Sequence, residues 1–225
     1  MKAGWDEISS SDIRRAVGGS QVNGDPTAKI GGLSIDSRTI KAGELFWSIR
    51  GTKYDGHDFI LKAFEIGAVG VVSEESEWKG RPDVRNKVSE KYKDRCIILV
   101  ADSIRALGDY AGWWRNRSDV KIAAITGSAG KTTTKEMTAA ILSITWNTLK
   151  NKGNFNNLIG LPLSLLSLKP EHERAVLEMG MNRAGEISRL TEIVKPDLGL
   201  ITNIGMAHLE GVGDIRGVKG KGGDG

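Results

Sequence analysis

Short apolar runs and amphipathic helical patterns alternate along the second half of the chain. The pattern predicts strands at 122–126, 146–149, 175–179 and 198–203, and helices at 133–142, 162–168 and 186–194. Such alternation is typical of a doubly wound parallel sheet with helices on both faces. The segment 217–225 is rich in glycine, which disfavours a helix. We therefore expect this sheet to be incomplete.

The first hundred residues predict a small α/β unit with its own core. Helices are expected at 12–17 and 59–66, and strands at 33–35, 45–49, 69–72 and 97–100. The segment 74–95 is highly charged and interrupted by Pro82, so we expect an exposed helix or loop there.

A junction helix is predicted at 104–114, with Asp102 and Ser103 as its N-cap and with Trp113 and Trp114 as packing residues. The fold class is thus α/β, in which a small N-terminal α/β domain (residues 1–101) precedes an incomplete P-loop-type parallel-sheet ATPase domain (residues 102–225).

A glycine-bounded turn between the strand at 122–126 and the helix at 133–142 predicts a phosphate-binding loop. The expected ATP-binding residues are Gly127, Ser128, Ala129, Gly130, Lys131, Thr132 and Thr133. Lys131 would bring positive charge to the phosphates and Thr132 a hydroxyl to Mg²⁺. Two residues separate the glycines, where the common Walker pattern has four. The alternative is an ordinary strand-to-helix turn with an exposed lysine.

Two side chains near strand ends are candidate metal ligands. Glu178 closes an apolar strand at the carboxyl edge, where parallel sheets bind ligands, and is expected to hold Mg²⁺ directly or through water. His208 follows the last predicted strand and Gly205, and is expected at a second metal or a phosphoryl group. The alternatives are a surface glutamate and a structural histidine.

Polar turns elsewhere are candidate substrate contacts. The segment 152–162 places three asparagines, Asn154, Asn156 and Asn157, in a turn before a helix, where caps and Asx-turns would occupy one or two of them. Ser37 and Arg38 follow a predicted strand, and the loop 51–58 follows another. These two turns together would form the rim of a nucleotide or sugar-phosphate site, with His57 interpreted as structural.

Composition limits the remaining classes of function. The chain has 225 residues, of which 39% are hydrophobic and 27% charged, with a net charge of +4 and a pI near 9.1. Basic residues are scattered among nearly as many acids, so we expect no nucleic-acid partner. We find neither an apolar run of spanning length nor a signal-peptide pattern, and we expect a cytoplasmic protein without membrane insertion. The single Cys96 is interpreted as a buried thiol.

Six segments together resemble the Mur ligase family. They are SIDSRTIKAGELFWSIRG, YDGHDF, ITGSAGKTTTKEM, GNFNNLIGLPLSLL, LEMGMNRAGEI and ITNIGMAHLEGVG, in family order from Ser34 to Gly213. The resemblance implies a UDP-muramoyl-peptide-binding domain, a central ATPase domain and a C-terminal domain that brings the amine. GNFNN and EMGMN indicate the member that joins D-Ala-D-Ala to UDP-N-acetylmuramoyl-tripeptide. ATP would phosphorylate the tripeptide carboxylate, and the amine would attack the acyl phosphate.

The resemblance also implies residue roles. Lys131 and His208 would be catalytic; Thr132, Glu178 and His208 would bind magnesium. Substrate contacts would come from Ser37, Arg38, Asn154, Asn157 and Asn182.

Two features depart from the family pattern. Lys221 is the nearest candidate for the family's carbamylated lysine, but its spacing from His208 is one residue short. The rest of the ATPase domain and the whole C-terminal domain are expected to be absent, so the chain reads as a fragment of doubtful stand-alone activity. The alternatives are a noncatalytic UDP-sugar- or nucleotide-binding module and an unrelated P-loop ATPase or kinase. The third residue of the tripeptide and the oligomeric state stay open.

Overall fold

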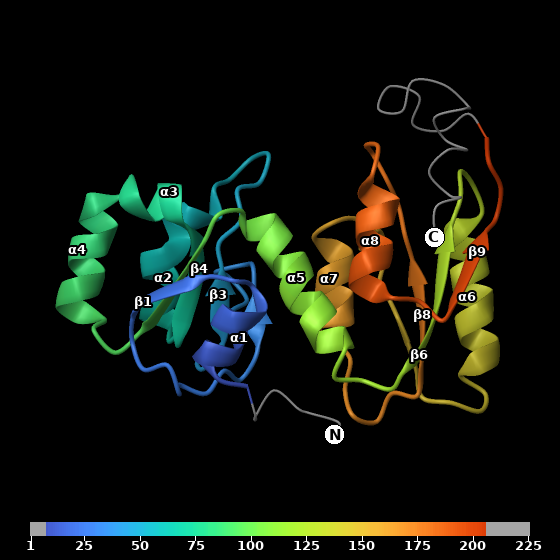
Figure 1. The fold of residues 1–225 in the computed structure, drawn as a ribbon, viewed down its shortest axis with the longest axis horizontal. Coiled ribbons are helices and arrows are strands. Elements are labelled where there is room, and N and C mark those ends of the chain that lie inside the picture. The colour runs from blue at the N-terminus through green and yellow to red at the C-terminus, as the bar shows by residue number, and fades with distance from the viewer. Residues whose placement is uncertain (1–7, 206–225) are drawn as a thin grey trace. The chain divides into compact units, whose positions relative to one another are not determined.

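The structure is a computed structural model that describes residues 8–205. The chain divides into two compact units, one ending at Tyr110 and the next beginning at Ala111. Each unit is built on its own sheet with helices beside it (Figure 1). The division falls inside one helix, α5 (Ser103–Arg115), whereas the sequence placed the boundary just before that helix.

The first unit contains a five-stranded sheet of order β1-β5-β4-β3-β2. The strands β2 to β5 are parallel, and β1 pairs antiparallel with β5. The strands are β1 (Ser20–Asn23), β2 (Leu33–Ser34), β3 (Leu45–Trp47), β4 (Gly70–Glu74) and β5 (Cys96–Val100). The helices are α1 (Ser10–Ala16), the 3-10 turn η2 (Gly56–Phe59), α2 (Ile60–Ile66), α3 (Glu75–Lys79) and α4 (Pro82–Lys91).

The core of this unit follows the two-residue period of the strands. Phe46 packs with Val71 and Ile97 in a cluster that includes buried residues of α2, α3 and α4. The next residue along β3, Trp47, points to the opposite face. There its ring stacks on Tyr110, with centroids 6.0 Å apart, and its Nε1 donates to the Ser103 carbonyl at 2.9 Å.

For the first unit, one expectation is confirmed and one strand was missed. The charged segment 74–95 forms the mostly exposed helices α3 and α4, which Trp78 and Val88 anchor in the core. Pro82 begins α4, since the first helical turn needs no N–H from it. The strand β1 was not predicted: its sequence Ser-Gln-Val-Asn carries almost no apolar signal, and pairing with β5 alone makes it a strand.

Cys96 is fully buried within β5, as expected. Burial raises the pKa of its thiol to about 11, and a hydrogen bond with Ser10 offsets only part of that effect. The thiol therefore stays protonated near neutral pH and behaves as a small apolar side chain.

The second unit contains a four-stranded, fully parallel sheet of order β7-β8-β6-β9. Its strands are β6 (Lys121–Thr126), β7 (Thr148–Lys150), β8 (Arg174–Glu178) and β9 (Leu198–Ile201); its helices are α6 (Lys131–Leu142), α7 (Gly160–Leu165) and α8 (Glu186–Val194). The helix α6 lies on one side of the sheet, and α7 and α8 lie on the other (Figure 1). From β6 the chain runs to β7 at one edge of the sheet, and from β8 it later runs past β6 to β9 at the opposite edge. This reversal creates a switch point at the carboxyl ends of β6 and β8, where open sheets of this kind bind ligands.

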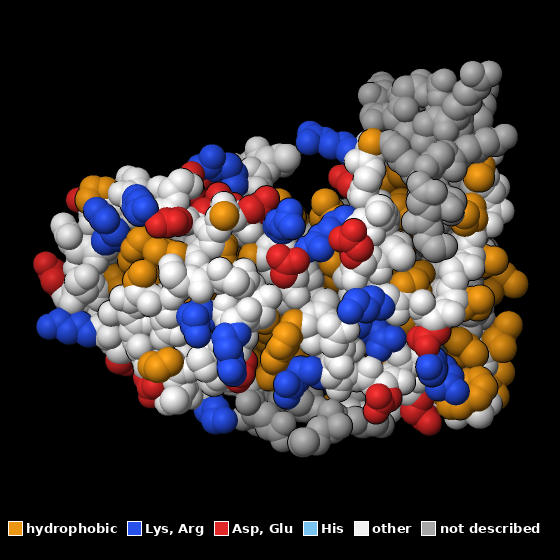
Figure 2. Space-filling view, in the orientation of Figure 1, with side chains coloured by type: hydrophobic (Ala, Val, Ile, Leu, Met, Phe, Trp, Pro, Cys, Tyr) orange, Lys and Arg blue, Asp and Glu red, His pale blue; other side chains and the backbone are white. Residues whose placement is uncertain are grey.

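These two sheets confirm the predicted α/β fold class. Trp114 is buried in the second unit and donates to the Leu168 carbonyl at 3.3 Å, so it is a packing residue, as expected. Basic and acidic side chains lie interspersed on the face drawn in Figure 2, in keeping with the scattered charges of the sequence. Among the residues that the structure describes, no helix has the length and apolarity needed to cross a membrane.

Candidate nucleotide-binding site

The loop between β6 and α6 turns on two glycines with positive φ. Gly127 has φ of 138° and Gly130, the N-cap of α6, has φ of 79°. A Cβ on Gly127 would also lie 2.2 Å from Thr202 Oγ1, so any side chain there would be strained and would collide. The Lys131 ammonium donates to the Gly127 carbonyl at 2.7 Å, which holds it beside the loop. The first N–H groups of α6 lack partners inside the helix, as at any helix start, and can receive an anion.

The chain that follows β9 braces this loop. The backbone N–H groups of Ser128 and Ala129 donate to the carbonyl and side-chain oxygens of Asn203, at 3.1 and 2.9 Å. Thr202 Oγ1 lies 2.6 Å from the Ala129 carbonyl. The N–H groups of Ser128 and Ala129 thus have protein partners in this structure, and the ATP-binding role of residues 127–133 stays a prediction.

Thr132 and Glu178 meet at the start of α6. The Thr132 hydroxyl donates to Glu178 Oε2 at 2.8 Å, across 46 residues of sequence. Glu178 is the last residue of β8 and its side chain is almost completely buried. A hydroxyl and a carboxylate are the hard oxygen ligands that Mg²⁺ prefers, so the donor set fits this ion. Lys131 lies beside Thr132 in the chain, so positive charge, hydroxyl and carboxylate all lie at one end of α6.

Two asparagines hold Glu178: Asn156, which the sequence analysis noted, and Asn151, which it did not name. Asn156 Nδ2 donates to Glu178 Oε1 at 2.8 Å, and the Asn156 carbonyl accepts the N–H of Gly180 at 2.8 Å. Asn151 accepts the Glu178 N–H at 2.9 Å and donates to the Glu178 carbonyl at 3.1 Å. Asn156 lies in the asparagine-rich segment already noted. Asn151 follows β7, so the rule that ligands gather at carboxyl strand ends would have indicated it.

The predicted substrate asparagines lie near this site but face other partners. Asn154 is exposed. The Asn157 side chain accepts the N–H groups of Ile159 and Gly160, at 3.1 and 2.8 Å, and so acts as an Asx-type cap for α7. Asn182 is exposed in the loop before α8, and its backbone N–H donates to Glu186 at 2.6 Å. The structure ties the loops of these asparagines together through Asn156, and their substrate roles stay predictions. His208 and Lys221 lie outside the described residues.

In the first unit, Arg38 is held by a neighbouring acid. Its guanidinium contacts both oxygens of Asp36, with the shortest distance at 2.6 Å, yet the side chain is 83% exposed. The hydrogen bond from the Arg38 side chain lowers the pKa of Asp36 to about 2. Ser37 is buried beside it. The turn therefore presents an oriented cation to solvent, and its role toward a ligand stays a prediction.

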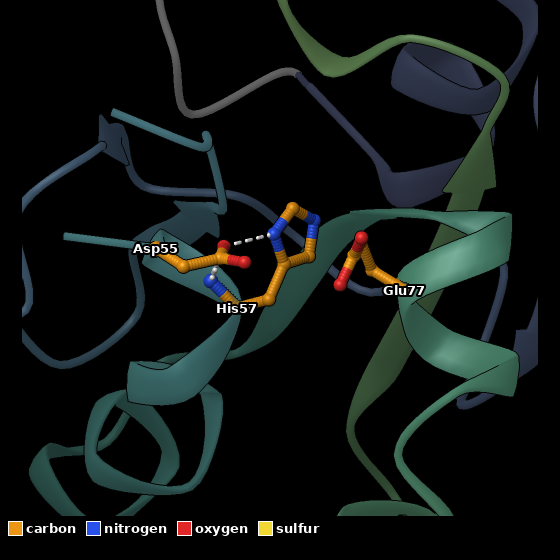
Figure 3. A group of neighbouring side chains, drawn as sticks. All are labelled: Asp55, His57 and Glu77. Carbon is orange, nitrogen blue, oxygen red and sulfur yellow. Dashed lines mark hydrogen bonds and ion pairs between the residues drawn. The ribbon is translucent and has the colours of Figure 1, made fainter. Parts of the chain in front are cut away.

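A second group of ligand-type side chains, Asp55, His57 and Glu77, lies in the first unit (Figure 3). The buried His57 ring accepts the Glu74 N–H at Nε2, 3.2 Å away, so its Nδ1 carries the proton donated to Asp55 at 2.6 Å. Arg50 and Arg81 each form ion pairs with both Asp55 and Glu77.

Hydrogen bonds explain the protonation states of this group. Burial opposes ionisation of Asp55, but hydrogen bonds from the His57 backbone and ring outweigh it and hold the pKa of Asp55 well below its usual range. The Arg81 guanidinium likewise lowers the pKa of Glu77. The protein's own cations neutralise both carboxylates, which supports the structural interpretation of His57 and argues against a metal there.

Two family descriptions match this chain: the Mur ligase family catalytic domain over residues 29–112 and the Mur ligase middle domain over residues 125–220. The chain belongs to the Mur ligase family, as its motifs predicted.

Within that family the chain is similar to UDP-N-acetylmuramoyl-tripeptide–D-alanyl-D-alanine ligases. It is 41% identical over 181 residues to the Synechocystis sp. enzyme of that name, covering 80% of this chain and 37% of the relative. It is 40% identical over 192 residues to the Escherichia coli enzyme, covering 84% and 39%. The chain thus spans about two fifths of the length of these relatives.

Solved structures agree with these matches. A crystal structure of MurF from Acinetobacter baumannii superposes with a TM-score of 0.83 at 33% identity, over 98% of this chain and 45% of that one. The Thermotoga maritima MurF ligase in complex with ADP superposes with a TM-score of 0.72 at 32% identity, over 84% and 41%. The latter relative binds an adenine nucleotide.

Proposed function

We propose that this chain supplies the UDP-substrate-binding and ATP-binding parts of a ligase that joins D-Ala-D-Ala to UDP-N-acetylmuramoyl-tripeptide in peptidoglycan precursor synthesis. The observation that carries the proposal is the hydrogen bond between Thr132 Oγ1 and Glu178 Oε2, 2.8 Å long, at the end of a glycine-bounded loop. This bond places two potential oxygen ligands for Mg²⁺ side by side, next to Lys131 and the N-terminus of α6. The relatives carry the same activity in their names.

The chemistry requires that a carboxylate become a good electrophile. In the proposed reaction, a carboxylate oxygen of the tripeptide attacks the γ-phosphorus of ATP; the bond to the β,γ-bridging oxygen breaks, and ADP leaves. The amine of D-Ala-D-Ala then attacks the acyl carbon, loses a proton, and expels inorganic phosphate as the amide forms. Both reactants of the first step are anions. Lys131 lowers their repulsion and positions the phosphates, since transfer of this kind depends on electrostatics and alignment.

Thr132 and Glu178 would hold Mg²⁺, which when bound neutralises phosphate charge. His208 is proposed as a further metal and catalytic residue. Arg38, with Ser37, is proposed to contact the uridine part of the substrate, because its exposed guanidinium is oriented by Asp36. Asn154, Asn157 and Asn182 are proposed to face the substrate. A cytoplasmic location stays part of this proposal.

The test measures binding, because the relatives extend well beyond the matched region. Calorimetry with Mg²⁺-ATP should show saturable binding to the unchanged chain, and Lys131→Ala should weaken it by about 100-fold, or about 2.7 kcal/mol. The same variant should bind UDP-N-acetylmuramoyl-tripeptide within about twofold of the unchanged chain, because Arg38 and Ser37 belong to the other unit.

Lys169→Ala is the matched control, because Lys169 is an exposed lysine of the same unit with a partner 3.8 Å away. If both lysine variants bind Mg²⁺-ATP like the unchanged chain, Lys131 is not the phosphate-binding residue. Binding of the UDP compound without any binding of ATP would favour the alternative, a noncatalytic UDP-sugar-binding module.

A further inference from the structure

Lys135 is a lysine of α6 whose side chain is completely buried. Its ammonium donates to the Asn151 carbonyl at 3.0 Å and lies 3.2 Å from Glu136 Oε1 and 3.9 Å from Glu178 Oε2. It follows Thr132 by three residues, so both side chains lie on one face of the helix. A buried ammonium is costly unless it is paired and hydrogen-bonded. Its presence here therefore needs an explanation from its neighbours.

Of its two acidic neighbours, only Glu178 needs a partner inside the protein. Glu136 is 46% exposed, and its Oε2 also pairs with Lys150 at the surface. Glu178 has a side chain only 3% exposed, and its hydrogen-bond donors, the Thr132 hydroxyl and the Asn156 amide, are neutral. Among the described residues within ion-pair distance, Lys135 alone brings positive charge to the buried carboxylate.

Lys135 also fixes the backbone that carries Glu178. Its bond to the Asn151 carbonyl orients a residue that grips Glu178 through both the N–H and the carbonyl. These contacts join α6, the end of β7 and the end of β8. The protein's own contacts thus hold the carboxylate at the start of α6.

Resting on the proposed function of Glu178, we propose that Lys135 is a positioning residue and the internal counter-ion of the metal site. It neutralises Glu178 in the absence of metal, so free Mg²⁺ meets a carboxylate that already has a cation beside it. A nucleotide brings additional negative charge, so Mg²⁺ binds with the nucleotide far better than alone. The order of binding at this site therefore depends on Lys135.

The experiment compares the unchanged chain with Lys135→Met, using Mg²⁺ alone as the probe in calorimetry and thermal unfolding. Lys135→Met should bind free Mg²⁺ at least about tenfold more tightly, because the substitution removes a positive charge 3.9 Å from Glu178 Oε2 that would repel a cation bound by this carboxylate. Its unfolding temperature should fall in metal-free buffer and rise again with Mg²⁺. The control is Lys150→Met, which removes a lysine from the exposed Glu136 and should change neither quantity.

Mg²⁺ affinity within about twofold of the unchanged chain would overturn the proposal, because a purely structural lysine would alter stability without altering metal affinity. If Lys135→Met does not fold at any Mg²⁺ concentration, folding of the double variant Lys135→Met/Glu178→Gln tests the counter-ion role instead. Recovery of folding in the double variant would show that the unpaired carboxylate caused the defect, and continued failure would overturn the counter-ion role. Failure of the proposed function is a separate result, because it would appear as absent Mg²⁺-ATP binding in the unchanged chain.

Discussion

Two clusters of ligand-type side chains, Asp55, His57 and Glu77 in the first unit and Thr132 and Glu178 in the second, differ in what neutralises their carboxylates. In the first unit, Asp55 and Glu77 are bound by Arg50 and Arg81, cations that the protein itself supplies in hydrogen-bonding contact. In the second unit, Glu178 receives hydrogen bonds from neutral groups, and the Lys135 ammonium, the one within ion-pair distance among the described residues, is 3.9 Å away.

This difference separates a structural ion network from a ligand site. Fork-shaped guanidinium groups occupy carboxylate lone pairs in fixed directions, so a metal would have to break several charge-assisted bonds. A threonine hydroxyl can instead rotate from the carboxylate toward a metal. Judged by spacing alone, the first cluster would be the better candidate for a metal site, because its ligand atoms all lie within 4.8 Å of one another. The hydrogen-bond and ion-pair partners of the carboxylates instead favour the second cluster as the metal site.

The largest expected effect comes from His57→Ala in the first cluster. The variant leaves the Glu74 N–H and Asp55 without their buried partner, so the unfolding free energy should fall by about 2–4 kcal/mol. Urea unfolding at neutral pH measures this loss, and the affinity for Mg²⁺-ATP measured beside it should not change. His172→Ala is the control, because the His172 ring accepts a hydrogen bond from the Lys169 N–H in an exposed position. A His57 variant of normal stability but altered nucleotide binding would reverse the roles of the two clusters.

A matched pair of charge removals, Glu178→Gln and Glu77→Gln, sharpens the comparison. Glu178→Gln should reduce the enhancement of ATP binding by Mg²⁺ about tenfold or more, because a neutral amide is a much weaker ligand for a hard cation. Glu77→Gln should leave that enhancement unchanged within about twofold and should lower stability instead. ATP titrations with and without Mg²⁺ give both values. If both variants lost the enhancement of ATP binding by Mg²⁺ equally, the distinction between a metal site and a structural ion network would be wrong.

The smallest effect is a dependence of stability on pH in the first cluster. The pKa of Asp55 is depressed in the folded chain, so its contribution to stability is complete above its unfolded pKa of about 4. That contribution decreases as the pH falls through the folded pKa. Between pH 6 and pH 3, Asp55→Asn should therefore lose less stability than the unchanged chain, by about 1 kcal/mol. Urea unfolding followed by methyl NMR signals of Ile60 and Val71 measures this, and parallel curves would contradict it.

Much of the second unit could be predicted from the sequence because its signals are local. The strand Lys121–Thr126, the turn at Gly127 and Gly130, and the start of α6 follow from periodicity and from backbone freedom at glycine. Glu178 was placed correctly at a strand end by the same kind of evidence. The strand β1 and the burial of Trp78 and Val88 in α3 and α4 were not predicted, because pairing and packing, rather than local composition, make them part of the core.

The sequence by itself determined the class of fold, the loop and the acid that faces it. Only the tertiary structure decided that Asn156, rather than Asn154 or Asn157, contacts Glu178, and that Lys135 is buried beside it. These contacts depend on the strand order β7-β8-β6-β9, which brings the ends of three strands together across long stretches of chain. The pairing of Lys135 with Glu178 therefore arises only where these strand ends lie together. A sequence names the charged residues, and the fold decides which of them already have a partner.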